Sequence, residues 1–243
     1  MKFLRVLYLP YKWLILFPLV VGLTLAFGTI AAVLSILISP KIGSFIGGVF
    51  WARLIGYLTP MLVKVIGREN IKKKQSYVIV SNHQSNYDII ALYGWLGIDF
   101  KWVMKQELRK VPGLGFGCEK IGHIFIDRSN SEKAIASINA AKKKIKNGTS
   151  VIFFPEGTRE KGGTDLGEFK KGAFKFALDL GLPLLPVTLV NTGKILPTHT
   201  FDVFPGKVKI IIHEKIDIAG CNDDNIETVM DRARSAIQSG LNQ

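Results

Sequence analysis

The chain has 243 residues, of which 48% are apolar, and its 32 Lys and Arg against 19 Asp and Glu give a net charge of +13. This length suits one medium-sized α/β domain with an additional segment, and no internal repeat points to a repeat architecture. An excess of basic and apolar residues together favours an anionic membrane surface or a phosphorylated ligand as partner. A nucleic-acid partner is the weaker interpretation, because no recognised nucleic-acid motif occurs and it leaves the apolar excess unexplained.

Residues 13–40 form an uncharged, strongly apolar run. The run is long enough to cross a bilayer, which needs about 20 residues, and too long for the apolar part of a cleaved signal peptide. We therefore expect a helix that either crosses the membrane or dips into one leaflet, and the pattern leaves both open. A basic and aromatic collar suited to the membrane interface precedes it: Lys2, Arg5, Tyr8, Tyr11, Lys12 and Trp13.

A second apolar segment follows Ser39-Pro40, where the first helix should end, and it runs from residue 42 to residue 66. It is rich in glycine, which lets helices approach each other closely. Arg53 lies in its middle, and a charge at the centre of a bilayer costs at least about 2.5 kcal/mol. The segment is therefore expected at the interface or at the edge of the globular domain. Residues 1–66 are predicted to form a two-helix membrane anchor, and residues 67–243 a separate α/β domain.

From Gly67 onward, strand-like runs alternate with helical patterns, which predicts an α/β fold with a mixed, largely parallel sheet flanked by helices. Lys72-Lys73-Lys74 is expected to be a solvated basic patch that faces lipid phosphates. Strands are expected at residues 76–80, 100–104, 121–126, 150–154, 184–190 and 208–212, and helices at residues 87–96, 131–146, 170–180 and 224–239.

His83 and Asp88 lie where the strand at 76–80 gives way to a helix, and ligands of open α/β sheets bind beyond the carboxyl ends of strands. A neutral imidazole takes a proton from a hydroxyl if an acceptor holds its other nitrogen, and Asp88 is placed to be that acceptor. No G-x-S-x-G nucleophile motif occurs, so we expect the hydroxyl to belong to the substrate. The alternative is that His83 caps the helix and Asp88 is an ordinary acid of the first turn.

Three further predicted strands also end in polar residues, which a parallel sheet would gather on the rim that holds His83. Lys105, Arg128 and Arg159 are the candidate phosphate ligands among them. Arginine suits a phosphate because its planar fork donates hydrogen bonds in pairs.

The segment 155–159, PEGTR, adds candidates for substrate binding. Gly157 would let the backbone approach a ligand or present an N–H to a developing oxyanion, with Glu156 and Thr158 beside it. A salt bridge that closes a loop would account for Glu156 or Arg159 alone. It accounts less well for their convergence with the other polar residues.

Five segments together resemble the glycerolipid acyltransferase family, and in particular its bacterial lysophosphatidic acid acyltransferases. Residues 82–88, NHQSNYD, resemble the N-H-x4-D block, and residues 154–159, FPEGTR, match the F-P-E-G-T-R block in full. Residues 122–128, GHIFIDR, match G-x-I-F-I-x-R, and residues 182–187, LPLLPV, resemble the fourth, proline-containing block. Residues 105–115 fit a K-x-E-L…P…G segment. The blocks follow the family's order, and the N-terminal apolar pair resembles its membrane anchor.

The resemblance implies transfer of a fatty acyl group from a thioester to the 2-hydroxyl of lysophosphatidic acid, which gives phosphatidic acid. On this interpretation, His83 deprotonates the hydroxyl, and Asp88 orients the imidazole and stabilises the imidazolium. The three cations bind the substrate phosphate. Glu156 holds an arginine or a substrate hydroxyl, and an N–H near Gly157 is an oxyanion donor. The acyl-chain pocket has no motif in the sequence.

Neither a metal nor a cofactor is implied, because the acyl donor, acyl-CoA or acyl carrier protein, is itself a substrate; the sequence favours neither donor. Membrane lipids are expected partners, and nucleic acid is not. The expected location is the inner membrane, with the catalytic domain (67–243) facing the cytoplasm. Two alternatives stay open: an acyltransferase for glycerol 3-phosphate or another lysophospholipid, and a catalytically dead basic membrane-binding module.

Overall fold

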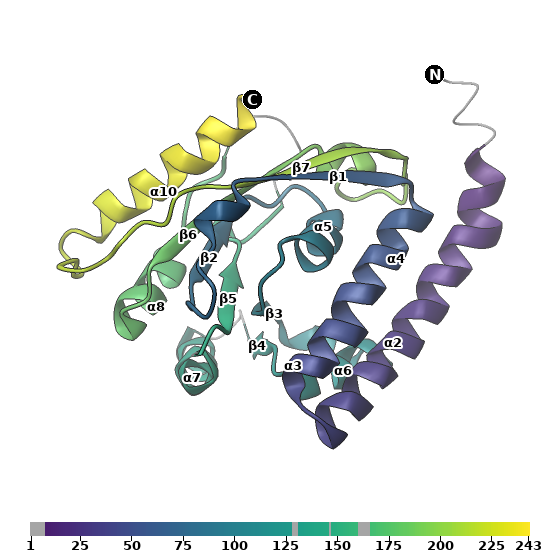
Figure 1. Cartoon of the computed structure of the whole chain (residues 1–243), viewed down its shortest axis with the longest axis horizontal. Helices are drawn as coiled ribbons and strands as arrows, with labels where there is room; N and C mark the ends of the chain where they lie inside the picture. Colours follow the sequence, from purple (N-terminus) through teal and green to yellow (C-terminus); the bar gives the residue numbers. More distant parts are fainter. Residues whose placement is uncertain (1–7, 128–130, 146, 160–165) are drawn as a thin grey trace.

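The structure, a computed structural model, describes residues 8–127, 131–145, 147–159 and 166–243. Within these residues, a seven-stranded sheet with the order β1-β7-β6-β2-β5-β3-β4 lies at the centre (Figure 1). All neighbouring strands are parallel except β6 and β7, which confirms the predicted mixed, largely parallel sheet. The strands are β1 (Met61–Ile66), β2 (Val78–Ser81), β3 (Phe100–Lys105), β4 (Ile124–Ile126), β5 (Ser150–Phe153), β6 (Leu184–Val190) and β7 (Gly206–Ile212).

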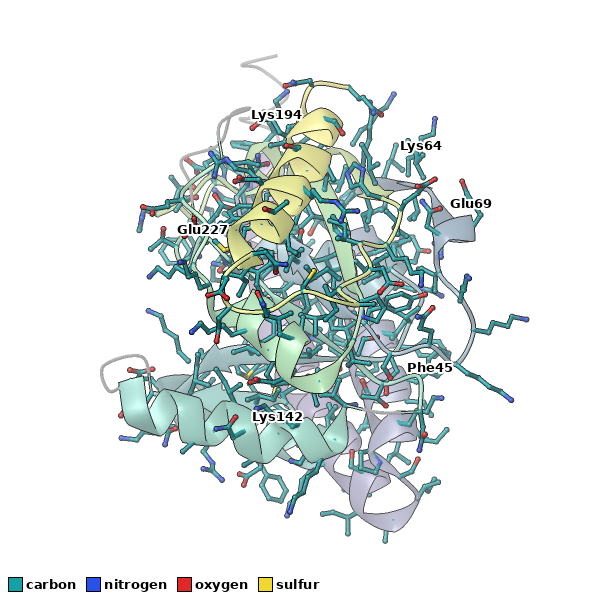
Figure 2. The ribbon with its side chains drawn as sticks, turned by 90° about the vertical axis from the view of Figure 1, so that its left-hand side faces the viewer. Phe45, Lys64, Glu69, Lys142, Lys194 and Glu227 are labelled. Atoms are coloured by element: carbon teal, nitrogen blue, oxygen red, sulfur yellow. The ribbon has the colours of Figure 1, made fainter. Side chains whose placement is uncertain are left out.

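Helices cover both faces of the sheet. On one face, α10 contacts β6, α8 contacts β2 and α7 contacts β4; Figure 2 views the molecule from this side. On the other face, α5 packs between the sheet and α4, and α2 and α6 lie outside them (Figure 1). The α-helices are α2 (Phe17–Leu37), α3 (Pro40–Gly43), α4 (Trp51–Leu58), α5 (Tyr87–Trp95), α6 (Leu114–Ile121), α7 (Ser131–Ala141), α8 (Gly172–Leu180), α9 (Thr192–Ile195) and α10 (Ile226–Leu241). Shorter π and 3-10 stretches are η1 (Lys12–Leu16), η2 (Ser44–Phe50), η3 (Arg68–Asn70), η4 (Gln106–Lys110) and η5 (Lys142–Lys144).

The described residues contain one helical stretch, Tyr8–Leu37, that is long and apolar enough to cross a membrane. It ends before Ser39-Pro40, as predicted, and the Ser39 hydroxyl accepts a hydrogen bond from the Ile42 N–H at 3.3 Å. Lys12 departs from the expected collar: its side chain is buried, and its Nζ lies 3.2 Å from an Asp202 oxygen. Lys2 and Arg5 lie outside the described residues.

Residues 61–66 are a correction to the sequence analysis, because they form strand β1 rather than the end of an apolar helix. The second helical stretch ends at Leu58. Burial alternates along residues 61–66, from buried Met61 to exposed Leu62 and onward, which is the period of a strand with one face on a core. Pairing with β7 satisfies the backbone. The division into an anchor (1–66) and a catalytic domain (67–243) stays a prediction, but its last six anchor residues belong to the sheet.

Helix α6 was not predicted, and it supports the apolar helix α2. A Cβ on Gly28 would lie 2.2 Å from the Gly113 carbonyl oxygen, and one on Gly117 would lie 2.5 Å from the Gly28 carbonyl oxygen. The two backbones therefore touch where side chains would hold them apart. The strand expected at 121–126 begins only at Ile124, because Gly122, with a φ of +94°, first closes α6 in the left-handed conformation.

Candidate active site

His83, in the loop between β2 and α5, forms a hydrogen-bonded pair with Asp88, in the first turn of α5. The His83 Nδ1 lies 2.7 Å from the Asp88 Oδ2. Asp88 is fully buried in the first turn of α5, whereas part of the His83 side chain is exposed. A carboxylate only accepts hydrogen bonds, so Nδ1 carries a proton, and in the neutral imidazole the lone pair is then on Nε2. The predicted base and its orienting acid are therefore in contact.

Two backbone groups hold the Asp88 carboxylate in place. Its Oδ2 also accepts from the N–H of Gln84 at 2.7 Å and from the N–H of Ser85 at 2.8 Å. The residue that precedes α5 is Asn86 rather than His83, so the helix-capping alternative for His83 does not describe its contacts. These bonds hold the Asp88 side chain in the orientation that reaches the His83 ring.

Glu156 holds the backbone of His83. The Glu156 side chain is buried, its Oε1 accepts from the His83 N–H at 2.8 Å, and its Oε2 accepts from the Gly167 N–H at 2.9 Å. These two bonds tie Glu156 to the loop that presents the imidazole. The predicted contact of Glu156 with an arginine or a substrate hydroxyl stays a prediction.

The imidazole ring of His83 stacks on aromatic side chains, a contact that was not predicted from the sequence. The His83 ring lies 3.9 Å from the Phe154 ring, centroid to centroid, at an interplanar angle of 8°. Phe154 stacks in turn on Trp102 at 5.8 Å. Phe154 is the first residue of the segment FPEGTR, so this motif could have indicated that Phe154 belongs to the site. Trp102 lies in the middle of β3, and nothing in its local sequence distinguishes it from a core residue.

The four strands that end in the predicted polar residues are neighbours and run parallel, in the order β2-β5-β3-β4. Their carboxyl ends therefore share one rim, as expected. Lys105 ends β3 on this rim and is exposed. Arg159 lies near the base, with its guanidinium donating to the Asn86 Oδ1 at 2.5 Å. Arg128 lies outside the described residues.

The turn after β5 contains a glycine in the left-handed region of backbone conformation. Gly157 has a φ of +74°, a region that strongly favours glycine. Its N–H donates to the Phe154 carbonyl at 3.0 Å, so this N–H closes the turn. Thr158 is exposed beside it. The Lys170 Nζ lies 3.1 Å from where a Gly157 Cβ would be, which adds a cation that the sequence analysis did not name.

The segment after α9, residues 196–203, is tied to the loop that carries His83. The Ser85 hydroxyl donates to the Leu196 carbonyl at 2.7 Å, and the Thr198 hydroxyl donates to the Gln84 carbonyl at 3.0 Å. Deeper in the sheet, the Asn82 side chain exchanges two hydrogen bonds with the backbone of Leu189. The polar residues around His83 thus fix the loop to β6 and to the segment beyond it.

Two apolar cavities flank α5, and Trp51 and Ile89 line both. The α6 cavity, of about 300 Å³, lies between α6, η2 and the C-terminal half of α2, with Trp102 on its wall. The loop cavity, of about 310 Å³, lies between the start of α2, α4 and residues 196–203, with Asn86 on its wall. Both volumes are at the lower end of the range for ligand sites, roughly 300–1,000 Å³.

A buried polar cluster lies on the wall of the α6 cavity. The Tyr93 hydroxyl lies 2.8 Å from the Ser44 hydroxyl and 3.3 Å from the His123 Nε2. Burial lowers the pKa of His123 well below its usual value and raises the pKa of the Cys118 thiol, on the same wall, to about 12. His123 is therefore neutral at pH 7 and is held by partners in the core.

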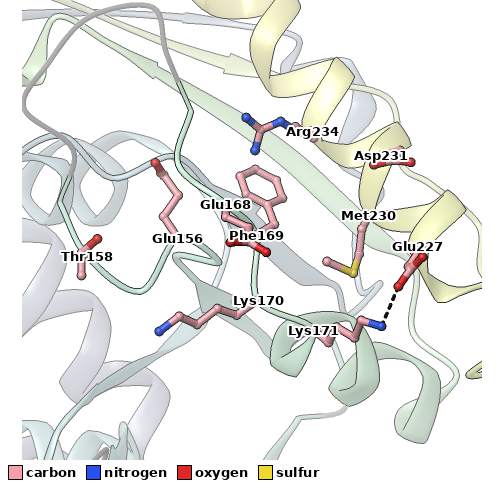
Figure 3. Close-up of a pocket in the computed structure, with 10 residues that line it drawn as sticks. All are labelled: Glu156, Thr158, Glu168, Phe169, Lys170, Lys171, Glu227, Met230, Asp231 and Arg234. Carbon is pink, nitrogen blue, oxygen red and sulfur yellow. Dashed lines mark hydrogen bonds and ion pairs between the residues drawn. The ribbon is translucent and has the colours of Figure 1, made fainter.

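A third, polar cavity of about 870 Å³ opens on the other side of Glu156, between the start of α8 and α10 (Figure 3). Lys171 pairs with Glu227 at 2.7 Å, and the Arg234 guanidinium donates to the carbonyl of Leu166 at 2.7 Å. This charged lining does not suit an acyl chain. Among the residues that the structure describes, no group of three or more His, Cys, Asp or Glu could hold a metal ion.

A model of the acyltransferase family matches residues 62–190. The chain is 36% identical over 178 residues to the chloroplastic 1-acyl-sn-glycerol-3-phosphate acyltransferase BAT2 of Brassica napus, which covers 72% of this chain and 50% of that protein. It is 32% identical over 185 residues to the 1-acyl-sn-glycerol-3-phosphate acyltransferase of Borreliella burgdorferi, covering 76% of this chain and 74% of that protein. The chain spans about half the length of the plant and algal relatives.

A solved structure resembles the whole chain. The crystal structure of the 1-acyl-sn-glycerophosphate (LPA) acyltransferase PlsC from Thermotoga maritima superposes with a TM-score of 0.81 at 26% sequence identity. The match covers 99% of this chain and 96% of that one. The shared architecture therefore includes the N-terminal helices as well as the sheet.

Proposed function

The chain belongs to the acyltransferase family, and from that premise we propose that it transfers a fatty acyl group from a thioester to the 2-hydroxyl of lysophosphatidic acid. The observation that carries the proposal is the 2.7 Å contact between the His83 Nδ1 and the Asp88 carboxylate on the ligand-binding rim of the sheet. The activity in the names of the relatives and of the superposed structure agrees with it.

The chemistry needs one base and no covalent enzyme intermediate. The His83 Nε2 takes the proton of the 2-hydroxyl as its oxygen attacks the thioester carbonyl, and Asp88 stabilises the imidazolium that forms. The tetrahedral intermediate then collapses, its bond to sulfur breaks, and the thiolate takes the proton from the imidazolium. The products are phosphatidic acid and a free thiol. Glu156 contributes by holding the His83 backbone so that Nε2 faces the substrate.

We assign the substrate phosphate to Arg159, Lys105 and Arg128, as the sequence analysis did. Arg159 has the strongest support, because its guanidinium donates to Asn86, and Asn86 is only three positions after His83 in the chain. Lys105 is supported by its exposed place on the same rim. Glu156, Gly157 and Thr158 line the turn beside them. Glu156 there acts through His83, and we assign Gly157 and Thr158 to the substrate side.

We assign the acyl chain of the donor to the α6 cavity. His83 stacks on Phe154 and Phe154 on Trp102, and Trp102 lines that cavity. An apolar chain in the cavity would therefore reach the base along one aromatic wall. Burial of the chain supplies binding energy in proportion to the apolar area removed from water. The geometry leaves acyl-CoA and acyl carrier protein equal as donors.

The apolar helix Tyr8–Leu37 supports membrane association, and membrane lipids are the proposed environment of the acceptor. We propose further that the chain resides at the inner membrane with its catalytic domain on the cytoplasmic side, where acyl donors are made. The high positive charge would favour the anionic lipids of that surface.

Mass spectrometry of the reaction products tests the proposal. Purified protein is given lysophosphatidic acid with acyl-CoA or with acyl carrier protein thioester, and phosphatidic acid should form with at least one donor. Parallel reactions with glycerol 3-phosphate and with other lysophospholipids test the neighbouring activities. Binding of lipid without product from any acceptor would instead support a catalytically inactive membrane-binding module.

A further inference from the structure

The loop cavity plays no part in the mechanism above. Its walls come from three separate parts of the chain: Leu16, Phe17 and Val20 of the apolar helix, Trp51, Ile55 and several residues of α5, and the segment from Leu196 to Val203. The Tyr87 hydroxyl is occupied by Thr59 at 2.7 Å, so this polar atom on the wall already has a partner. The cavity therefore offers an apolar surface to whatever fills it.

One end of the cavity lies at the catalytic loop. Asn86 lines the cavity and at the same time holds the Arg159 guanidinium. Leu196, which also lines the cavity, accepts a hydrogen bond from the Ser85 hydroxyl through its carbonyl oxygen. This end of the cavity is therefore formed by a residue only three positions from His83, and it adjoins Arg159, to which we assigned the phosphate.

The other end of the cavity lies at the apolar helix. Phe17 and Phe201 meet there edge to face, with ring centroids 5.8 Å apart, and Phe201 is 65% exposed. The buried Lys12 holds Asp202, the next residue, to the helix. Trp13 and Leu14 are exposed on the neighbouring turn of the same helix. An apolar path therefore leads from the surface that would face lipid to the catalytic loop.

We propose that the loop cavity binds the fatty acyl chain at the sn-1 position of the lysophospholipid acceptor. This inference rests on the proposed function. A lysophosphatidic acid whose phosphate lies at Arg159 and whose 2-hydroxyl lies at His83 has its sn-1 chain beside Asn86, where the cavity opens. The chain then passes between α5 and the segment 196–203 toward Phe17 and the membrane.

The two cavities account for the two chains that the reaction brings together. They lie next to each other along α5, and Ile89 and Trp51 line both of them. The α6 cavity reaches His83 through Trp102 and Phe154, whereas the loop cavity reaches it through Asn86 and Ser85. A donor chain and an acceptor chain could therefore approach one base from two sides without competing for the same space.

Replacing Val20 by Trp tests the assignment, with Val21→Trp as the matched control. Val20 lines the loop cavity and not the α6 cavity, whereas Val21 is the next residue of the same helix and is 54% exposed. Kinetics are measured in detergent micelles with acceptors that carry hexanoyl, decanoyl or palmitoyl chains at sn-1, and then with donors of varied chain length.

Val20→Trp should raise the KM for the palmitoyl acceptor by at least ~10-fold, because each methylene kept out of an apolar site costs ~4-fold in affinity. The effect should shrink as the sn-1 chain shortens, and the preference among donor chains should not change. Val21→Trp should match the wild type. Thr200→Trp, on the exposed rim of the cavity, repeats the test on a surface loop if Val20→Trp does not fold.

Two results would overturn the inference. If a folded Val20→Trp or Thr200→Trp changes only the preference among donor chains, the cavity binds the acyl chain of the donor instead. If the KM depends on the length of the sn-1 chain in the variants as it does in the wild type, the acceptor chain stays in the micelle or bilayer during the reaction. Either result requires a wild-type protein that acylates lysophosphatidic acid. A wild type without that activity contradicts the proposed function itself, so the two failures can be told apart.

Discussion

The two faces of the sheet are covered by similar apolar residues, but they differ in what else they contain. On the α10 side, Phe174, Phe176 and Ile237 are buried in a cluster that joins α8 and α10 to the sheet. On the α5 side, Tyr77, Leu92 and Phe100 are as fully buried. That side nevertheless also contains both apolar cavities, the stack of Phe154 on His83, and the helix that would enter a membrane.

Among the described residues, both apolar cavities lie on the α5 face, whereas the cavity on the α10 face has a charged lining. Protein interiors are normally packed to the density of organic crystals, and an empty cavity costs stability. Two cavities on one face therefore indicate space reserved for ligands. From this comparison we expect substitutions at the catalytic rim to change turnover at constant stability, and substitutions under α10 to change stability at constant turnover.

The largest expected effect is that of His83→Ala. It should lower kcat by ~10²–10⁴, the usual contribution of a positioned general base. The thermal unfolding transition, followed by circular dichroism, should not change, because His83 fills no core position. Asp88→Asn should cost up to ~10⁴ in kcat. The two losses should not add, because both residues serve one proton transfer.

The pH dependence gives a second measurement on the same pair. Wild-type kcat should fall as the medium is acidified, because a protonated imidazole cannot accept the proton of the 2-hydroxyl. The residual activity of His83→Ala should lack this fall. Near-wild-type turnover by a folded His83→Ala would remove His83 from the mechanism.

On the α10 side, Ile237→Ala should produce the opposite pattern. Ile237 is fully buried, and truncation of a buried isoleucine typically costs about 2–5 kcal/mol of unfolding free energy. Thermal unfolding in detergent measures the loss. The kcat and KM of the fraction that stays folded should equal those of the wild type. A change in acyl-chain preference would show that the two faces are coupled.

The smallest of these effects is expected for Arg159→Ala. Loss of a charge-assisted contact, worth about 1.5–3 kcal/mol, should raise the KM for lysophosphatidic acid by ~10–100-fold and leave the KM for the donor nearly unchanged. Arg159→Lys should rescue poorly, because an ammonium cannot reproduce the planar fork that Asn86 holds. If only the KM for the donor increases, Arg159 binds the thioester donor rather than the acceptor phosphate.

The sequence by itself determined the parts of this protein that depend on local pattern. The period-2 and period-3.6 patterns indicated the α/β fold and most strand positions, because side chains alternate across a strand and recur along one face of a helix. Pro40 indicated the end of the first helix. The segment NHQSNYD identified His83 and Asp88, because the two residues are only five positions apart and their geometry is nearly local.

The tertiary structure alone decided which distant residues meet. Residues 61–66 are apolar enough for either a helix or a strand, and only pairing with β7 selects the strand. Glu156 could not be assigned to the His83 N–H, nor Phe154 to its ring, because those contacts require β5 to lie beside β2. The two cavities have no sequence signature at all, since each is a space between helices and loops that are far apart in the chain.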